Sequence, residues 1–193
     1  MRIISVEGLV GPGYATRTLD RIIGIGVHHT VSAYRAWTAV EERAHVLALD
    51  ADHRAREDGT WGGLGYAALI FPSGNIYVAG PLTQMRAGVY GRNREIASFA
   101  IVGSFMAVQP THAALASAGV LARKWQADLG RDVPIKGHRE WALPGSWTAC
   151  PGDTWQAWMP IIALASRNAE LEDSISAEIG KLRKRMAYDV YVA

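Results

Sequence analysis

The chain has 193 residues, of which 49% are hydrophobic, and this suits one α/β domain with room for an appendage. Its net charge of +2 is too small to indicate a nucleic-acid partner. The single cysteine, Cys150, excludes an internal disulfide, and no apolar run approaches the roughly 18 residues that span a bilayer. The first residues lack the apolar core and cleavage site of a signal peptide, so we expect synthesis in the cytosol.

The first third of the chain predicts an irregular arm, a buried strand and a helix. Residues 1–21 contain several glycines and a proline, which are typical of turns and predict an irregular arm. Residues 21–28 form an isoleucine-rich run between polar residues and predict a buried strand. Between residues 32 and 56, apolar side chains recur at helical spacing and predict an amphipathic helix. These apolar side chains are Trp37, Val40, Ala44 and Leu47.

The middle of the chain predicts mostly strands. Residues 66–71 and 75–79 flank the turn sequence PSGN, which predicts a β-hairpin with Gly74 in its turn. Residues 81–95 predict a loop, and residues 98–104 predict another buried strand.

Helices are predicted again towards the C-terminus. Thr111 is the predicted N-cap of a helix that Gly130 terminates. Residues 133–136 predict a short strand, and residues 153–167 predict a helix with a kink at a proline.

Residues 168–188 carry a repeat of apolar side chains with acidic residues first and basic residues last, which suits a helix dipole. Two interpretations remain open: a helix packed on the domain surface, or a short coiled coil. We therefore expect a monomer or a weak dimer formed through this helix. The repeating side chains are Leu171, Ile175, Ile179, Leu182 and Met186.

Candidate metal ligands stand at two strand ends and in one loop. His28 ends the first predicted strand, His138 follows the last one, and Cys150 lies in the loop beyond it. Neighbouring residues of a strand point to opposite faces, so only one of His28 and His29 can face a shared site. Imidazole and thiolate are ligands that zinc prefers, and three of them with an open fourth position are typical of catalytic zinc. The alternatives are a buried core cysteine or a thiol nucleophile with a histidine base.

Four segments occur in an order that spans roughly residues 22–158: IGVHHT, WGGLGYAALIFPSGNIYVAG, AGVYGRN with SFAIVGSF, and IKGHREW with TACPG. In this combination they resemble the zinc-dependent N-acetylmuramoyl-L-alanine amidases of type 2. That family includes phage lysozyme-type amidases and peptidoglycan recognition proteins. The strand ending in HHT and the GHRE–TACPG element are specific only together.

The resemblance implies that His28, His138 and Cys150 hold one Zn²⁺ per chain. It further implies that Tyr66 and Thr148 are catalytic. Tyr66 matches a tyrosine that sits over the zinc-bound water. Thr148 matches a residue that helps to polarise the substrate carbonyl.

The resemblance also implies an α/β fold in which helices flank both faces of a central mixed β-sheet. The expected amidase domain covers residues 1–166, and residues 167–193 form a C-terminal helical extension. The chain departs from the family pattern at Ala67 and Gly88, where many members carry histidine. Neither position is a zinc ligand, so we expect altered substrate contacts and an intact metal site.

Side chains near these motifs are candidates for substrate contact. Aromatic rings that line a groove suit sugars and peptides, and the alternative for the tryptophans is a place in the core. Arginine and asparagine side chains suit a peptide carboxylate or a sugar. The glutamate of GHRE is also a candidate base or hydrogen-bond partner of a ligand histidine, against the simpler reading of a solvated loop charge. The candidates are His29, Trp61, Arg86, Asn93, Glu140 and Trp147.

The sequence therefore predicts a peptidoglycan hydrolase that cleaves the amide between N-acetylmuramic acid and L-alanine. The expected setting is a phage endolysin that is made in the host cytoplasm and acts on the cell wall at lysis. The alternatives are a non-catalytic peptidoglycan-binding module and a cytosolic amidase that recycles muropeptides.

Overall fold

The computed structural model describes residues 1–168, apart from the side chains of residues 57 and 58. The helix predicted over residues 168–188 lies beyond this range except for its first residue, and so does the dimer predicted from it. No helix within the described range is long and apolar enough to cross a membrane.

A mixed six-stranded sheet forms the centre of the described chain, in the order β1-β5-β4-β7-β3-β8. Its strands β4 and β5 form the predicted antiparallel hairpin, and all other neighbours in the sheet are parallel. The strands are Ile3–Ser5 (β1), Gly24–His29 (β3), Ala68–Ile70 (β4), Ile76–Val78 (β5), Ile96–Ile101 (β7) and Ile135–Gly137 (β8). Two further short strands, Ala15–Thr16 (β2) and Gln84–Met85 (β6), pair separately.

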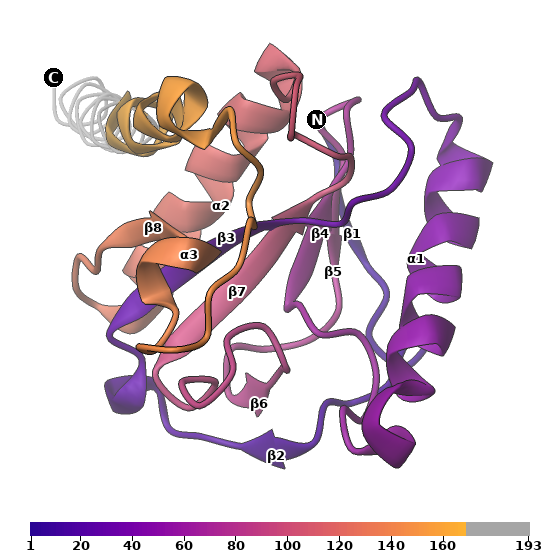
Figure 1. Cartoon of the computed structure of the whole chain (residues 1–193), viewed down its shortest axis with the longest axis vertical. Coiled ribbons are helices and arrows are strands. Elements are labelled where there is room, and N and C mark those ends of the chain that lie inside the picture. The colour runs from indigo at the N-terminus through magenta and orange to yellow at the C-terminus, as the bar shows by residue number, and fades with distance from the viewer. Residues whose placement is uncertain (169–193) are drawn as a thin grey trace, which may run out of the picture.

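Helices cover both faces of this sheet, which confirms the expected α/β architecture (Figure 1). Helix α1 (Ala39–Arg54) lies on one face, while α2 (His112–Leu129) and a helix over residues 155–168 lie on the other. Alternate residues of β7 divide between the two cores: Phe99 packs with the side chains of α2, and Ala100 packs in the core beneath α1.

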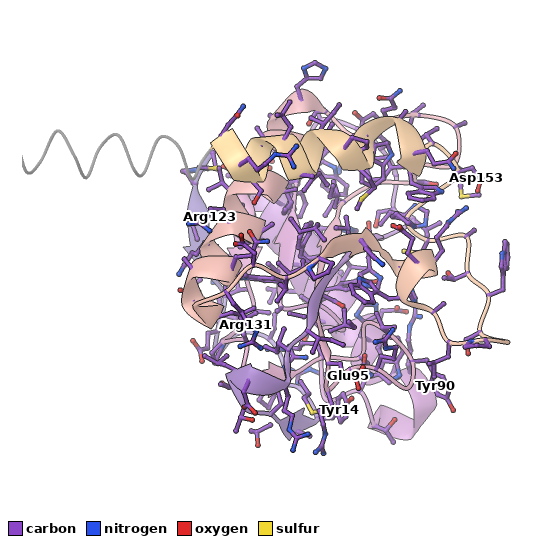
Figure 2. All side chains as sticks on the ribbon, turned by 90° about the vertical axis from the view of Figure 1, so that its left-hand side faces the viewer. Tyr14, Tyr90, Glu95, Arg123, Arg131 and Asp153 are labelled. Atoms are coloured by element: carbon purple, nitrogen blue, oxygen red, sulfur yellow. The ribbon has the colours of Figure 1, made fainter. Side chains whose placement is uncertain are left out.

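The predicted ends of α2 are both confirmed. The side chain of Thr111 accepts a hydrogen bond from Ala114 N, and Gly130 ends the helix in the left-handed region at φ 65°. Arg131, labelled in Figure 2, donates to the carbonyl oxygens of Leu19 and Ile22. The C-terminal end of α2 is thereby joined to the turn that precedes β3.

The prediction of an irregular arm over residues 1–21 is wrong in part. Ile3–Ser5 joins the edge of the sheet, with Ile3 paired to Ile76 of β5. A strand of three residues is too short to show an alternating pattern, and its hydrogen bonds come from a distant partner. The predicted loop over residues 81–95 likewise contains β6.

Helix α1 begins later than predicted because Thr38 caps it. The Thr38 side chain accepts a hydrogen bond from Glu41 N, and the Glu41 carboxylate accepts one from Thr38 N. The ring of Trp37 therefore lies before the helix, where it packs edge-on against Phe71.

The predicted apolar face of α1 is also wrong, since Val40 is 80% exposed and Leu47 is partly exposed. The true inward face carries three polar residues, and each of them has a partner. The Tyr77 hydroxyl donates a hydrogen bond to the Glu42 carboxylate. Leu64 N donates to the Asp50 carboxylate, and Gly65 N donates to the His53 imidazole. The inward residues of α1 are Glu42, Val46, Asp50 and His53.

Candidate metal centre

Two parallel strands bring the predicted ligands together. Strands β3 and β8 are neighbours, with Val27 paired to Gly137, so His28 and His138 both lie at the carboxyl ends of these strands. His138 is the first residue of α3 (His138–Trp141). The backbone N–H of Arg139 donates to the carbonyl oxygen of Cys150 and draws the cysteine loop against this helix.

The three side chains fit a metal ion. One ligand atom from each of His28, His138 and Cys150 lies within 4.8 Å of the other two. Zinc binds nitrogen at roughly 2.0–2.1 Å and sulfur at roughly 2.3 Å, so tetrahedral ligand atoms lie roughly 3.3–3.8 Å apart. Cys150 Sγ lies 3.6 Å from His28 Nδ1, inside that range. Two imidazoles and one thiol therefore form a donor set suited to zinc, with a fourth position left for water or substrate.

Burial sets the protonation of these ligands in the metal-free protein. Desolvation, reinforced by the neighbouring His138, holds the pKa of His28 well below 6.5, and desolvation lowers that of His138 to about 4. Both imidazoles are therefore neutral and able to bind a cation at neutral pH. Desolvation raises the pKa of the Cys150 thiol to about 12, although the backbone N–H of His29 donates to Sγ at 3.4 Å and favours the thiolate.

Tyr66 lies beside the ligands. Its ring centroid is 5.0 Å from that of His28, and it lines the same cavity. Burial, reinforced by Cys150, raises the pKa of the Tyr66 phenol above its ordinary value of 10. The phenol is therefore neutral and carries a proton that it can donate.

Thr148 lines the same cavity from the cysteine loop. Its Oγ1 accepts a hydrogen bond from Cys150 N at 3.1 Å, which leaves the hydroxyl proton to donate elsewhere. The structure thus places both predicted catalytic residues in one cavity with the three candidate ligands.

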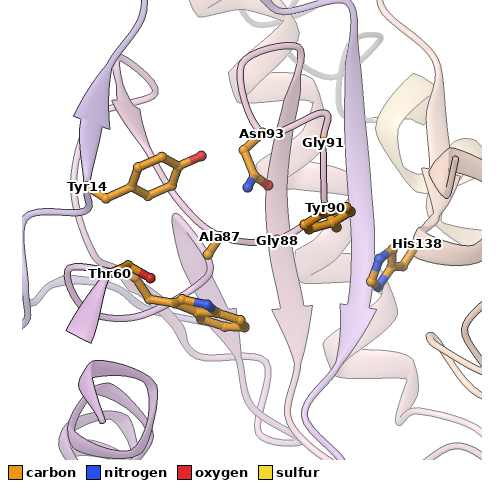
Figure 3. A pocket seen from close by; sticks show the side chains of 9 residues that line it. Tyr14, Thr60, Ala87, Gly88, Tyr90, Gly91, Asn93 and His138 are labelled. Atoms are coloured by element: carbon orange, nitrogen blue, oxygen red, sulfur yellow. The ribbon is translucent and has the colours of Figure 1, made fainter. Parts of the chain in front are cut away.

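Two adjoining cavities surround this centre. The cavity of about 590 Å³ contains the ligands, and the cavity of about 400 Å³ lies beside it (Figure 3). They share Trp61, Ala87, Gly88 and His138. The smaller cavity has three aromatic side chains and no Asp, Glu, Lys or Arg among its described lining residues. Its aromatic residues are Tyr14, Trp61 and Tyr90.

Three of the predicted substrate contacts line these cavities. His29 lies in the larger one, Asn93 in the smaller one, and Trp61 in both. The Oδ1 atom of Asn93 accepts a hydrogen bond from Val89 N, so the side chain is held in place.

The other three predicted contacts lie elsewhere. Arg86 is only 3% exposed and donates to the carbonyl oxygens of Gly11 and Ala79, so it joins backbone segments and does not reach the substrate cleft. Glu140 accepts a hydrogen bond from Gly137 N at the start of α3. Trp147 is 86% exposed and lines neither cavity.

Sequence reasoning missed several residues of the cleft. Tyr14 lies in the segment that was predicted to be an irregular arm, and Tyr90 lies in a predicted loop without periodicity. Neither tyrosine therefore had a local signal that pointed to the cleft. His53 had a signal, because it recurs at helical spacing with Glu42, Val46 and Asp50 on the inward face of α1. Its ring lies 5.2 Å from that of Trp61 between centroids.

Comparison with known proteins agrees with this geometry. The family model described as N-acetylmuramoyl-L-alanine amidase (Amidase_2) matches residues 18–153. No curated protein matches the chain.

Several solved structures share the fold. The N-acetylmuramoyl-L-alanine amidase LysC from Clostridium intestinale is 21% identical with a TM-score of 0.61, over 79% of this chain and 90% of that chain. Bumblebee PGRP-SA is 20% identical with a TM-score of 0.68, over 81% and 95% of the two chains. Human PGRP-IBETAC, solved with glycosamyl muramyl pentapeptide, is 19% identical with a TM-score of 0.67, over 78% and 90%. By the match of the family model, the chain belongs to the N-acetylmuramoyl-L-alanine amidase family.

Proposed function

We propose that the chain is a zinc-dependent amidase that hydrolyses the bond between the lactyl group of N-acetylmuramic acid and the L-alanine of the stem peptide. The observation that carries the proposal is the complete set of His28, His138 and Cys150 in the cleft of a chain from this family. A zinc ion held by these three side chains supplies a Lewis acid for the amide carbonyl and a water of pKa about 7.

The side chains around the ligands complete the chemistry. Because burial keeps the Tyr66 phenol protonated in the metal-free protein, it is suited to orient the attacking water or to donate a hydrogen bond to the oxyanion. Thr148 donates its hydroxyl proton to the carbonyl oxygen of the scissile amide. The aromatic walls of the adjoining cavity pack against the rest of the muropeptide, and the predicted contacts His29, Trp61 and Asn93 belong to this cleft.

Two alternatives fit the site less well. A peptidoglycan-binding module needs no metal, so the filled ligand set favours catalysis over recognition alone. A thiol enzyme needs a reactive thiolate, whereas burial raises the pKa of Cys150 to about 12 in the metal-free protein.

The proposed biological setting is an endolysin that acts on the host cell wall at lysis. A similar structure, 22% identical, is described as the endolysin amidase LysCS from Clostridium intestinale. A cytosolic amidase that recycles wall fragments uses the same chemistry on soluble muropeptides, so the two settings differ in substrate size. Comparing the rates on intact sacculi and on soluble muropeptides separates them.

Mass spectrometry of the fragments released from purified peptidoglycan tests the activity. The proposal requires free stem peptides with an L-alanine amino terminus. They must vanish when the metal is stripped and return with zinc. Release of sugars alone, or binding to the wall without any release, contradicts the proposal. A Cys150→Ser variant that keeps full metal content and activity contradicts the ligand assignment.

A further inference from the structure

Ser98 is a buried polar side chain beneath the metal centre. It lies on β7, is 3% exposed, and its Oγ lies 3.1 Å from Nε2 of His28. The other ring nitrogen of His28, Nδ1, faces Cys150 Sγ at 3.6 Å. The two nitrogens of this imidazole thus face different partners: one faces the serine hydroxyl and the other faces the centre of the donor set.

We propose that Ser98 is a positioning residue of the metal centre, whose hydroxyl oxygen accepts the Nε2–H of His28. This inference rests on the zinc site of the proposed function. A neutral imidazole carries one proton, so a proton held on Nε2 leaves the lone pair of Nδ1 for the metal ion. The same hydrogen bond fixes the rotation of the ring. Hydrogen-bond partners of this kind raise the metal affinity of ligand histidines.

The space around Ser98 is kept open by two glycines. A Cβ atom at Gly88 would lie 2.4 Å from Ser98 Oγ and 2.6 Å from Ser98 Cβ. One at Gly26 would lie 3.0 Å from Oγ and 3.2 Å from His28 Nε2. Real Cβ atoms essentially never approach closer than 3.0 Å. A side chain at position 88 and the side chain of Ser98, its hydroxyl included, therefore exclude each other. Glycine is required at position 88 because any side chain there would occupy the space that the Ser98 side chain fills.

Zinc affinity, measured by competition with a chromophoric chelator, tests the proposal without relying on hydrolysis. We expect Ser98→Ala to weaken zinc binding by about 10–100-fold. Gly88→Ala weakens it as well, because the new Cβ displaces the Ser98 side chain and with it the hydroxyl. In a Ser98→Gly background, Gly88→Ala costs no further affinity. The matched control is Ser117→Ala on α2, which removes another buried serine hydroxyl, one that donates to Gly74 O, and leaves zinc affinity within about twofold.

A second readout separates positioning from general destabilisation. Nitrogen-15 NMR of the metal-free protein reports the tautomer of His28, and we expect the Nε2–H form in the wild type and a mixture in Ser98→Ala. Unchanged zinc affinity in both Ser98→Ala and Gly88→Ala overturns the proposal, and so does a wild-type His28 protonated on Nδ1. If Ser98→Ala does not fold, Gly88→Ala decides. A wild type that binds no zinc overturns this inference and the proposed function together, whereas one that binds zinc without cutting peptidoglycan overturns the proposed function alone.

Discussion

Asp50 holds the loop that leads to the catalytic cleft, so its replacement by alanine should destabilise the protein. Its Oδ1 atom accepts hydrogen bonds from Gly11 N at 2.9 Å and Leu64 N at 2.8 Å. Its other oxygen pairs with the half-exposed Arg54. Asp50→Ala therefore leaves two buried backbone N–H groups without their acceptor, and the segment before Tyr66 loses one of its two anchors on α1.

The magnitude follows from those two donors. Each buried donor left without a partner costs about 1–3 kcal/mol, and the lost ion pair with the half-exposed Arg54 adds under about 1 kcal/mol. Water that enters the truncated site recovers part of this cost. We therefore expect the free energy of unfolding to fall by about 2–4 kcal/mol in Asp50→Ala.

Urea unfolding of the metal-free protein, followed by circular dichroism, measures this difference. The matched control is Asp52→Ala on the same helix, where the carboxylate is 57% exposed and pairs with Arg56, so the expected loss is under about 1 kcal/mol. Equal unfolding free energies for the two variants would refute the reasoning.

Three further predictions concern the cleft. Tyr66→Phe should lower kcat by about 10–1000-fold in the peptidoglycan assay while zinc affinity stays unchanged, since only the phenolic hydroxyl group is lost; full activity would remove Tyr66 from the mechanism. Treatment with 1,10-phenanthroline should abolish hydrolysis and added zinc should restore it, whereas persistent activity would rule out a metal enzyme. Desolvation lowers the pKa of His53 from 6.5 to about 4. Between these two pH values the unfolded chain binds a proton that the folded chain does not, so the free energy of unfolding should fall as the pH falls from 7 to 4. His53→Gln should show a shallower slope in urea unfolding at pH 7 and pH 5, and an unchanged slope would contradict the assignment.

The central strands and the cluster of His28, His138 and Cys150 were predictable, because each has a strong local signal. Isoleucine-rich runs marked β3, and the motifs around His28, His138 and Cys150 located the donor set. The capping residues of α2, Thr111 and Gly130, were equally predictable from the sequence, because the hydrogen bonds of a cap form within one turn of the helix.

The remaining features depend on distant partners. The inward face of α1 was missed because Glu42, Asp50 and His53 are polar, and burial of polar groups is favourable only when partners elsewhere in the chain satisfy them. Strand β1 was missed because its partner strand supplies its hydrogen bonds. Arg86 looked like a substrate contact because a sequence does not reveal which carbonyl oxygens surround a guanidinium.

The pairing of β3 with strands from later in the chain affects how the protein emerges from the ribosome. All 6 residues of β3 are buried, and both of its neighbours in the sheet, β7 and β8, are synthesised after it. Because 70 residues separate His28 from Ser98, translation at roughly 5–20 residues per second leaves β3 without its first partner for roughly 4–14 s. During that interval the apolar strand is open to association with other nascent chains. Slower initiation of translation or a bound chaperone should therefore raise the yield of folded protein.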